Sequence, residues 1–131
     1  FFQDYKNTFS IFKKKIIKNR NDLNNLLADY LKEKKIVVGI GCPGRCSTFL
    51  NFCKINNKKM QYIAEQSSSL KLKKFLPGMR IPIIDEKYML SNQPDLAVIL
   101  SWHYADEIIE IMRKKGFKSQ ILIPFPYLKF V

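Results

Sequence analysis

The residue types best suited to chemistry in this chain gather in one glycine-rich segment. An apolar stretch, 36–40, leads into a run of small, polar and basic residues: Gly41, Cys42, Pro43, Gly44, Arg45, Cys46, Ser47 and Thr48. Glycine lets a backbone approach a ligand closely, and a helix that begins after such a loop presents free N–H groups to an anion. The segment therefore predicts a phosphate-binding loop between a strand and a helix.

The same glycines permit a second interpretation. Gly39, Gly41 and Gly44 have the G-x-G-x-x-G spacing of dinucleotide-binding folds, and Glu65 ends the next apolar stretch, near where such folds hold a ribose. Against this, Pro43 occupies the stretch that should begin the helix, so the helix is expected to start late. A NAD-type dinucleotide-binding module stays open as an alternative.

No catalytic constellation accompanies this loop. His103 beside Tyr104 could act as a general base, but we prefer a positioning role at the edge of a binding site. Glu107 is expected to serve a helix terminus or a ligand hydroxyl. The sequence shows no Ser/His/Asp order, no phosphate-loop lysine and no paired carboxylates, so we expect no catalytic residue in this chain.

The three cysteines, Cys42, Cys46 and Cys53, are the first candidates for a metal site. Zinc normally takes four ligands, and the only histidine, His103, is far away in the sequence. The odd number of cysteines and the lack of secretory signals favour reduced thiols in a cytoplasmic protein. We therefore expect no metal site and no cofactor in this chain, and we expect Cys53 to pack as a small apolar residue.

Alternating strands and helices are needed to position these residues. Apolar runs predict strands over 35–41, 60–65, 81–84, 95–102 and 120–123, and apolar spacing predicts helices over 6–34, 48–56 and 104–115, with a turn or short helix over 85–92. Particular residues add three expectations. The first helix could break at 19–21, Pro82 should place its strand at a sheet edge, and Gly116 should cap the last helix.

This order of elements predicts an α/β fold. We expect a Rossmann-like three-layer sandwich with a mostly parallel sheet, preceded by a long N-terminal helix. Residues 1–34 should form this leading helix and connect to an upstream domain, and residues 35–131 should form the Rossmann-like domain. Ligands bind beyond the carboxyl ends of parallel strands, so four segments should share one rim: 41–48, 65–74, 101–104 and 124–127.

Charge and length limit the possible partners. The 131 residues include 23 basic and 11 acidic side chains, for a formal net charge of +12. We interpret the lysine excess as solvated helix faces, and we disfavour nucleic acid because no element gathers arginines or stacking aromatics. No apolar run reaches the roughly 20 residues of a membrane helix, so no membrane partner is expected. The chain begins with Phe1, and we expect it to be part of a longer protein.

Several blocks of this sequence resemble the C-terminal domain of S-adenosylmethionine-dependent sugar C-methyltransferases. Residues 41–51 are similar to that family's GAPAKGNTLLN loop, and residues 77–83 resemble its PGxxIPI segment. Residues 94–108 are similar to its PD…aWNfxdEI block, and residues 123–126 resemble its closing iPiP. The blocks keep the family's order and cover residues 36–126.

The resemblance implies a function. The C-terminal domain of such enzymes helps to hold a nucleotide-linked keto sugar, typically a dTDP-hexose, while an upstream S-adenosylmethionine domain methylates a sugar carbon and a small N-terminal domain binds zinc. It implies that this chain is not catalytic alone and that S-adenosylmethionine and zinc belong to other domains. It assigns substrate binding to Gly41, Pro43, Gly44, Arg45, Ser47, Thr48, Lys71, Trp102, His103, Glu107 and Pro124.

Within this assignment the residues divide by role. The amides of 41–48 and the Arg45 side chain should meet the diphosphate, assisted by Lys71. Trp102, His103 and Glu107 should line the sugar or base, and the turn at 124–126 should close the rim.

The sequence departs from the family pattern at several positions. Gly44, Arg45, Cys46 and Ser47 replace Ala, Lys, Gly and Asn in the loop, and His103 replaces Asn. The identities of the sugar and the nucleotide therefore stay open. A structural domain that only packs against a catalytic domain is a further alternative, which an exposed apolar face on the first helix would favour.

Overall fold

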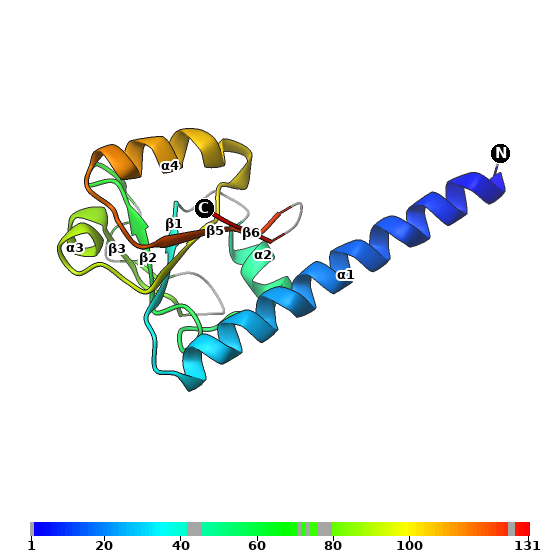
Figure 1. The fold of residues 1–131 in the computed structure, drawn as a ribbon, viewed down its shortest axis with the longest axis horizontal. Coiled ribbons are helices and arrows are strands. Elements are labelled where there is room, and N and C mark those ends of the chain that lie inside the picture. The colour runs from blue at the N-terminus through cyan, green and yellow to red at the C-terminus, as the bar shows by residue number, and fades with distance from the viewer. Residues whose placement is uncertain (1, 42–45, 71, 73, 76–79, 126–127) are drawn as a thin grey trace.

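A six-stranded sheet lies at the centre of the part of the chain that the structure, a computed structural model, describes: residues 2–41, 46–70, 72, 74–75, 80–125 and 128–131 (Figure 1). The strands are β1 (Val37–Ile40), β2 (Tyr62–Glu65), β3 (Ile83–Asp85), β4 (Leu96–Ile99), β5 (Gln120–Ile123) and β6 (Lys129–Phe130). Their spatial order is β3-β2-β1-β4-β5-β6, and every pair is parallel except β5 and β6. The predicted α/β class with a mostly parallel sheet is confirmed.

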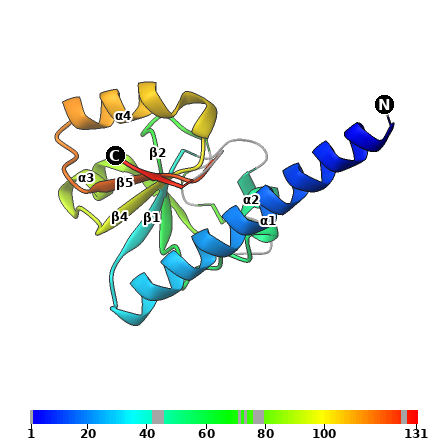
Figure 2. The same cartoon turned by 45° about the vertical axis from the view of Figure 1, so that its right-hand side comes forward.

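Helices cover both faces of this sheet. They are α1 (Phe2–Lys32), α2 (Cys46–Phe52), α3 (Glu86–Ser91) and α4 (Ala105–Lys114), with a 3-10 turn, η1 (Trp102–Tyr104), before α4. Figure 2 shows α1 and α2 together on one side and α4 on the other. The buried side chains divide in the same way, because one cluster joins the sheet to α1 and α2 and the other joins it to α3 and α4. The predicted three-layer sandwich is confirmed.

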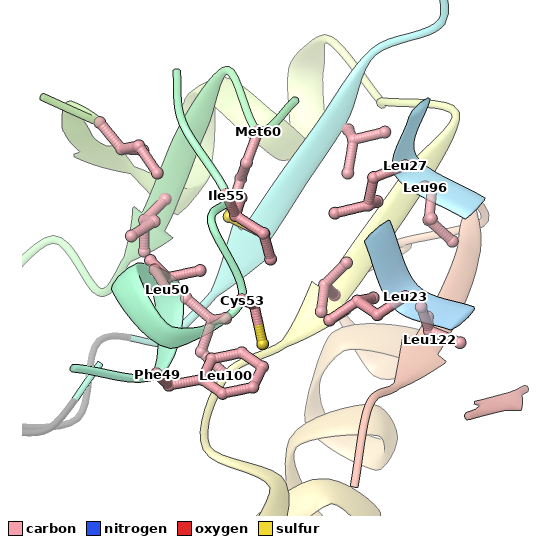
Figure 3. Close-up of a cluster of buried hydrophobic side chains, with 14 of the residues drawn as sticks. Leu23, Leu27, Phe49, Leu50, Cys53, Ile55, Met60, Leu96, Leu100 and Leu122 are labelled. Carbon is pink, nitrogen blue, oxygen red and sulfur yellow. The ribbon is translucent and has the colours of Figure 1, made fainter. Parts of the chain in front are cut away.

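Side-chain alternation along the strands builds the two cores. Within β1, Val37 belongs to the α1–α2 cluster and Val38 to the α3–α4 cluster, and Leu96 and Ala97 of β4 divide likewise. Both faces of these strands are buried, which explains their continuous apolar sequence. Figure 3 shows the first cluster, whose labelled members are Leu23, Leu27, Phe49, Leu50, Cys53, Ile55, Met60, Leu96, Leu100 and Leu122.

Cys53 packs in this first cluster with none of its surface exposed. Burial is the main cause that raises the pKa of its thiol to about 11. The prediction that Cys53 acts as a small apolar residue is confirmed.

Helix α1 is continuous, so the predicted possible break at 19–21 is wrong. The segment holds neither Gly nor Pro, and the side chains of Asn19 and Arg20 contact residues outside the helix. Asn19 is buried and its Nδ2 donates to the carbonyl of Pro124, while the guanidinium of Arg20 lies 5.1 Å from the ring centre of Phe52. The C-terminal half of α1 packs on the sheet, and its N-terminal half extends away from it (Figures 1 and 2).

Two helix ends depend on lysines in the left-handed backbone region. Lys34 (φ 57°) follows α1 and Lys54 (φ 55°) follows α2. In both cases the next amide bonds back to the helix, and for α2 the amide of Ile55 donates to Leu50 at 2.9 Å. Helix α2 therefore ends at Phe52, four residues before the predicted end at residue 56.

The remaining predictions for the elements are mostly confirmed. Strand β3 lies at a sheet edge, as Pro82 predicts, and Gly116 ends α4 with φ 93°. The prediction that 120–123 is the last strand is wrong, because β6 follows it and pairs antiparallel with β5. A strand of two residues is too short to leave a periodic signal in the sequence.

Candidate functional site

The carboxyl ends of β1, β2 and β4 meet at Gly41. The amide of Gly41 donates to the carbonyl of Ala64 at 3.1 Å, and its φ of 79° lies in the region that favours glycine. A Cβ at this position would lie 2.9 Å from Oγ of Ser101. The turn after β1 thus requires glycine for both conformation and space, and three of the four predicted rim segments adjoin here.

Gly39 has a different reason to be glycine. It lies inside β1, and a Cβ there would approach Cδ1 of Leu100 to 2.7 Å and Sδ of Met60 to 3.0 Å. Its role is close packing within the core. The first glycine of the apparent dinucleotide spacing therefore has a structural explanation that involves no ligand.

Four of the predicted site residues lie outside the described residues, namely Pro43, Gly44, Arg45 and Lys71. Besides Gly41, the described loop residues are Ser47, in the first turn of α2, and Thr48, which is exposed in the same turn. Helix α2 begins at Cys46, two residues before the predicted start at 48. The described part of the segment thus agrees with a loop that leads directly into a helix.

Trp102 belongs to an aromatic cluster that joins three chain segments. Its ring centre lies 5.0 Å from that of Phe49 in α2 and 5.2 Å from that of Phe125, which follows β5. Phe49 and Phe125 are themselves 5.3 Å apart. This packing brings α2 next to the ends of β4 and β5, so the predicted rim extends across these strands as well.

The other predicted residues lie close to Trp102 or Phe125 in the sequence. His103 is exposed beside Trp102, with 5.7 Å between ring centres. Glu107 is exposed in the first turn of α4, where an acidic residue suits the helix dipole. Pro124 is buried, and its carbonyl accepts the hydrogen bond from Asn19. That bond ties the end of β5 to α1.

A groove between α3 and α4 opens beside Gly41, and we call it the α3–α4 groove. Its volume is about 320 Å³, and the residues that line it are Ile40, Gly41, Ala64, Glu65, Gln66, Glu86, Ser101, Ile108, Ile111 and Met112. Only Gly41 among them was predicted as a substrate-binding residue. Gln66 and Ser101 lie in predicted rim segments but were given no binding role. Glu86 was missed, although it follows the predicted strand 81–84 by two positions, which is the signal that could have found it.

An ion pair bridges the two helices of this groove. Nζ of Lys115, at the end of α4, lies 2.5 Å from Oε1 of Glu86, at the start of α3. Glu86 is buried, with 11% of its side chain exposed, while the Lys115 side chain is 40% exposed. By contrast, the Glu65 carboxylate has no hydrogen bond or ion pair to any residue that the structure describes. The groove thus offers one neutralised carboxylate and one uncommitted carboxylate.

The segment that follows β2 is held to the start of α3. Oδ1 of Asp85 accepts from the amide of Lys87 at 3.0 Å and from Oγ of Ser67 at 2.9 Å. These bonds, the amide first, hold the pKa of the Asp85 carboxyl below its usual value. The cap fixes the beginning of α3 and therefore the position of Glu86 in the groove.

The described residues include neither a membrane-spanning helix nor a metal-binding cluster. None of the helices in this part of the chain is long and apolar enough to cross a membrane. In the same part, His, Cys, Asp and Glu side chains form no group of three or more that could hold a metal ion.

Comparison with known proteins gives two matches. A family model described as the C-methyltransferase C-terminal domain matches residues 3–126. The C-methyltransferase NovU of Streptomyces niveus is 30% identical to this chain over 110 residues, which is 82% of this chain and 26% of that relative. The chain therefore spans about a quarter of the length of the curated relative that it matches.

Proposed function

This chain belongs to the C-methyltransferase C-terminal domain family, and on that premise we propose that it holds a nucleotide-linked keto sugar for a C-methyltransferase. The observation that carries the proposal is the turn at Gly41, where the ends of β1, β2 and β4 adjoin a groove of about 320 Å³. Binding beyond the carboxyl ends of parallel strands is the general rule for this kind of sheet. A dTDP-hexose is the substrate class that we propose.

The roles in this proposal divide along the rim. The amides at the start of α2 and the Arg45 side chain meet the diphosphate, with assistance from Lys71. An arginine suits this role because its guanidinium presents paired donors to phosphate oxygens. Trp102, His103 and Glu107 lie on the side of the sugar or base, and the Pro124 turn closes the rim.

In this proposal the chain binds and orients the nucleotide sugar, and other parts of the protein catalyse the methyl transfer. S-adenosylmethionine and zinc are held by domains upstream of this chain, in the cytoplasm. We assign only binding roles to the residues of this chain.

The proposal is tested by calorimetric titration of the chain with dTDP-glucose, dTDP and UDP. We expect saturable binding, and we expect Arg45→Ala to weaken it about tenfold or more, since a charge-assisted hydrogen bond contributes roughly 1.5–3 kcal/mol. Arg80→Ala is the matched control, because Arg80 is exposed and precedes β3 at the opposite end of the sheet. Absence of saturable binding to all three ligands would rule the proposal out.

One observation favours a second candidate, a domain that packs against a catalytic domain without binding ligand. The N-terminal half of α1 extends away from the sheet, and Ile11 on it is 55% exposed (Figure 1). On this view the chain binds no nucleotide, but adding the upstream part of the protein raises its melting temperature. The two candidates are thus separated by the same titration.

A further inference from the structure

The α3–α4 groove has the wrong charge for a phosphate. Glu65 and Glu86 both line it, and Lys115, the cation that contacts Glu86, is already paired with that carboxylate. An anion here would meet net negative charge, which costs free energy in a partly desolvated site. The diphosphate of the proposed substrate therefore belongs on the other side of Gly41, toward α2.

The groove does have the lining that a neutral polar ring needs. Ile108, Ile111 and Met112 of α4 form an apolar wall, and Ile111 is 47% exposed. Hydrogen-bonding side chains from the strand ends, Glu65, Gln66 and Ser101, complete the lining. Ligand sites typically combine such an apolar surface with a few polar groups.

The volume of the groove limits the size of the ligand that it can bind. About 320 Å³ lies at the lower end of the roughly 300–1,000 Å³ range of ligand pockets. One ring fits this volume better than a whole nucleotide sugar does. The groove thus suits one moiety of a larger ligand whose other parts lie outside it.

We propose that the α3–α4 groove binds a neutral, hydroxyl-bearing ring. Vicinal hydroxyls of the ring donate to the Glu65 carboxylate, and its C–H face packs against Ile111. The inference rests on the proposed function, because the ring is part of the same nucleotide sugar. In a dTDP-hexose the hexose carries these hydroxyls, because deoxyribose lacks the 2′-hydroxyl. In a UDP-linked sugar the ribose carries vicinal hydroxyls as well.

The first measurement reads the groove directly and needs no nucleotide binding. Carbon-13 methyl spectra of Ile108, Ile111 and Met112 are recorded while methyl β-D-ribofuranoside or methyl α-D-glucopyranoside is added to the chain. We expect saturable shifts of these three methyl signals and none at Ile11, which lies on the extended half of α1. If neither glycoside moves the three signals, the inference is wrong, whatever the nucleotide titrations give.

The second measurement uses variants to identify the ring. Glu65→Gln removes the charge and one acceptor, so we expect about tenfold weaker binding of the ligand whose ring occupies the groove. Glu110→Gln is the matched control, since Glu110 pairs with Lys114 on the exposed face of α4. Ile111→Trp fills the groove from an exposed position and should abolish the shifts of the Ile108 and Met112 methyl signals, with Ile11→Trp as its control.

The pattern across ligands distinguishes the two sources. If Glu65→Gln weakens UDP but not dTDP, which lacks the 2′-hydroxyl, the ring is the ribose. If it weakens dTDP-glucose but not dTDP, the ring is the hexose. If the unaltered chain binds dTDP-glucose and neither Glu65→Gln nor Ile111→Trp changes that affinity, the inference fails while the proposed function stands.

Discussion

Glycine is required at position 41 for two reasons, its positive φ and its closeness to Ser101. A matched pair of variants can separate the two effects. Gly41 (φ 79°) and Gly116 (φ 93°) share the left-handed backbone region, but an added Cβ meets Ser101 only at Gly41 and meets nothing within 4 Å at Gly116. We predict that Gly116→Ala costs about 1 kcal/mol of unfolding free energy, the conformational term alone. Gly41→Ala should cost about 1–3 kcal/mol more because of overpacking.

Urea denaturation of the two glycine variants checks this prediction. Combining Gly41→Ala with Ser101→Ala should recover part of the loss, because the contact at 2.9 Å then disappears. Equal losses at Gly41 and Gly116 would contradict the steric part of the explanation.

Tyr62 carries a buried hydroxyl that has no hydrogen-bond partner among the described residues. Burial is the main cause that raises its pKa to about 12, and the nearby Tyr88 adds to it. An unfolded tyrosine titrates near 10, so the unfolded state loses its proton first and stability falls as the pH rises from about 10 to 12. Cys53 has the same effect between about 9 and 11.

Replacing Tyr62 by phenylalanine should therefore do no harm at neutral pH. We predict a free energy of unfolding that is unchanged or higher by up to about 1 kcal/mol at pH 7, and a smaller fall between pH 10 and 12. Denaturation curves at several pH values measure both, with Tyr88→Phe at the exposed neighbouring ring as control. A loss of more than about 1 kcal/mol at pH 7 would mean that the hydroxyl has a partner.

The pair between Lys115 and Glu86 should contribute more than an ordinary surface pair. Lys115→Met leaves the buried Glu86 carboxylate without its cation, and we predict a loss of about 1–2 kcal/mol, reduced from the fully buried case because Lys115 is 40% exposed. Lys114→Met is the control, since its pair with Glu110 is 75% and 68% exposed and should contribute less than about 0.5 kcal/mol. Similar losses in the two variants would contradict the inter-helix role.

At the scale of elements, α1 is attached to the sheet by a polar contact as well as by leucines. Asn19→Ala leaves the buried Pro124 carbonyl unpaired, and we predict a loss of about 1–2 kcal/mol. Asn21→Ala, at an exposed position two residues further along α1, makes the same gain in helix propensity without this loss. The two variants are compared by thermal denaturation. Equal stabilities would show that the bond between Asn19 and Pro124 does not stabilise the fold.

The elements differ in how well their sequences predict them. The strands β1 and β4 are buried on both faces, so their apolar runs are easy to recognise. The end of β4 was placed three residues too late, at residue 102, because the chain turns into η1 there. The end of α2 was placed four residues too late, because Lys54 adopts a positive φ that its residue type does not announce. The possible break in α1 was wrong because Asn19 bonds to a residue 105 positions away.

At the scale of the whole molecule, the sequence predicted the three layers of the sandwich but not the α3–α4 groove. The order of strands and helices, read with the rule that ligands meet strand ends, predicted the rim near Gly41 and Trp102. The α3–α4 groove depends on Glu86 and Lys115, which lie on different helices and 29 positions apart. No local pattern records such a pair, because its partners come together only when both helices pack on the same face.

Binding at the carboxyl ends of the strands is tested most directly by mapping which residues a nucleotide sugar contacts. Amide spectra of the nitrogen-15 chain are followed while dTDP-glucose is added. We predict saturable shifts at Gly41 and Ser101, which follow β1 and β4, and at Thr48 in the first turn of α2. Shifts confined to Gln61 and Gln93, at the opposite end of the sheet, or no saturable shift at all, would contradict this prediction.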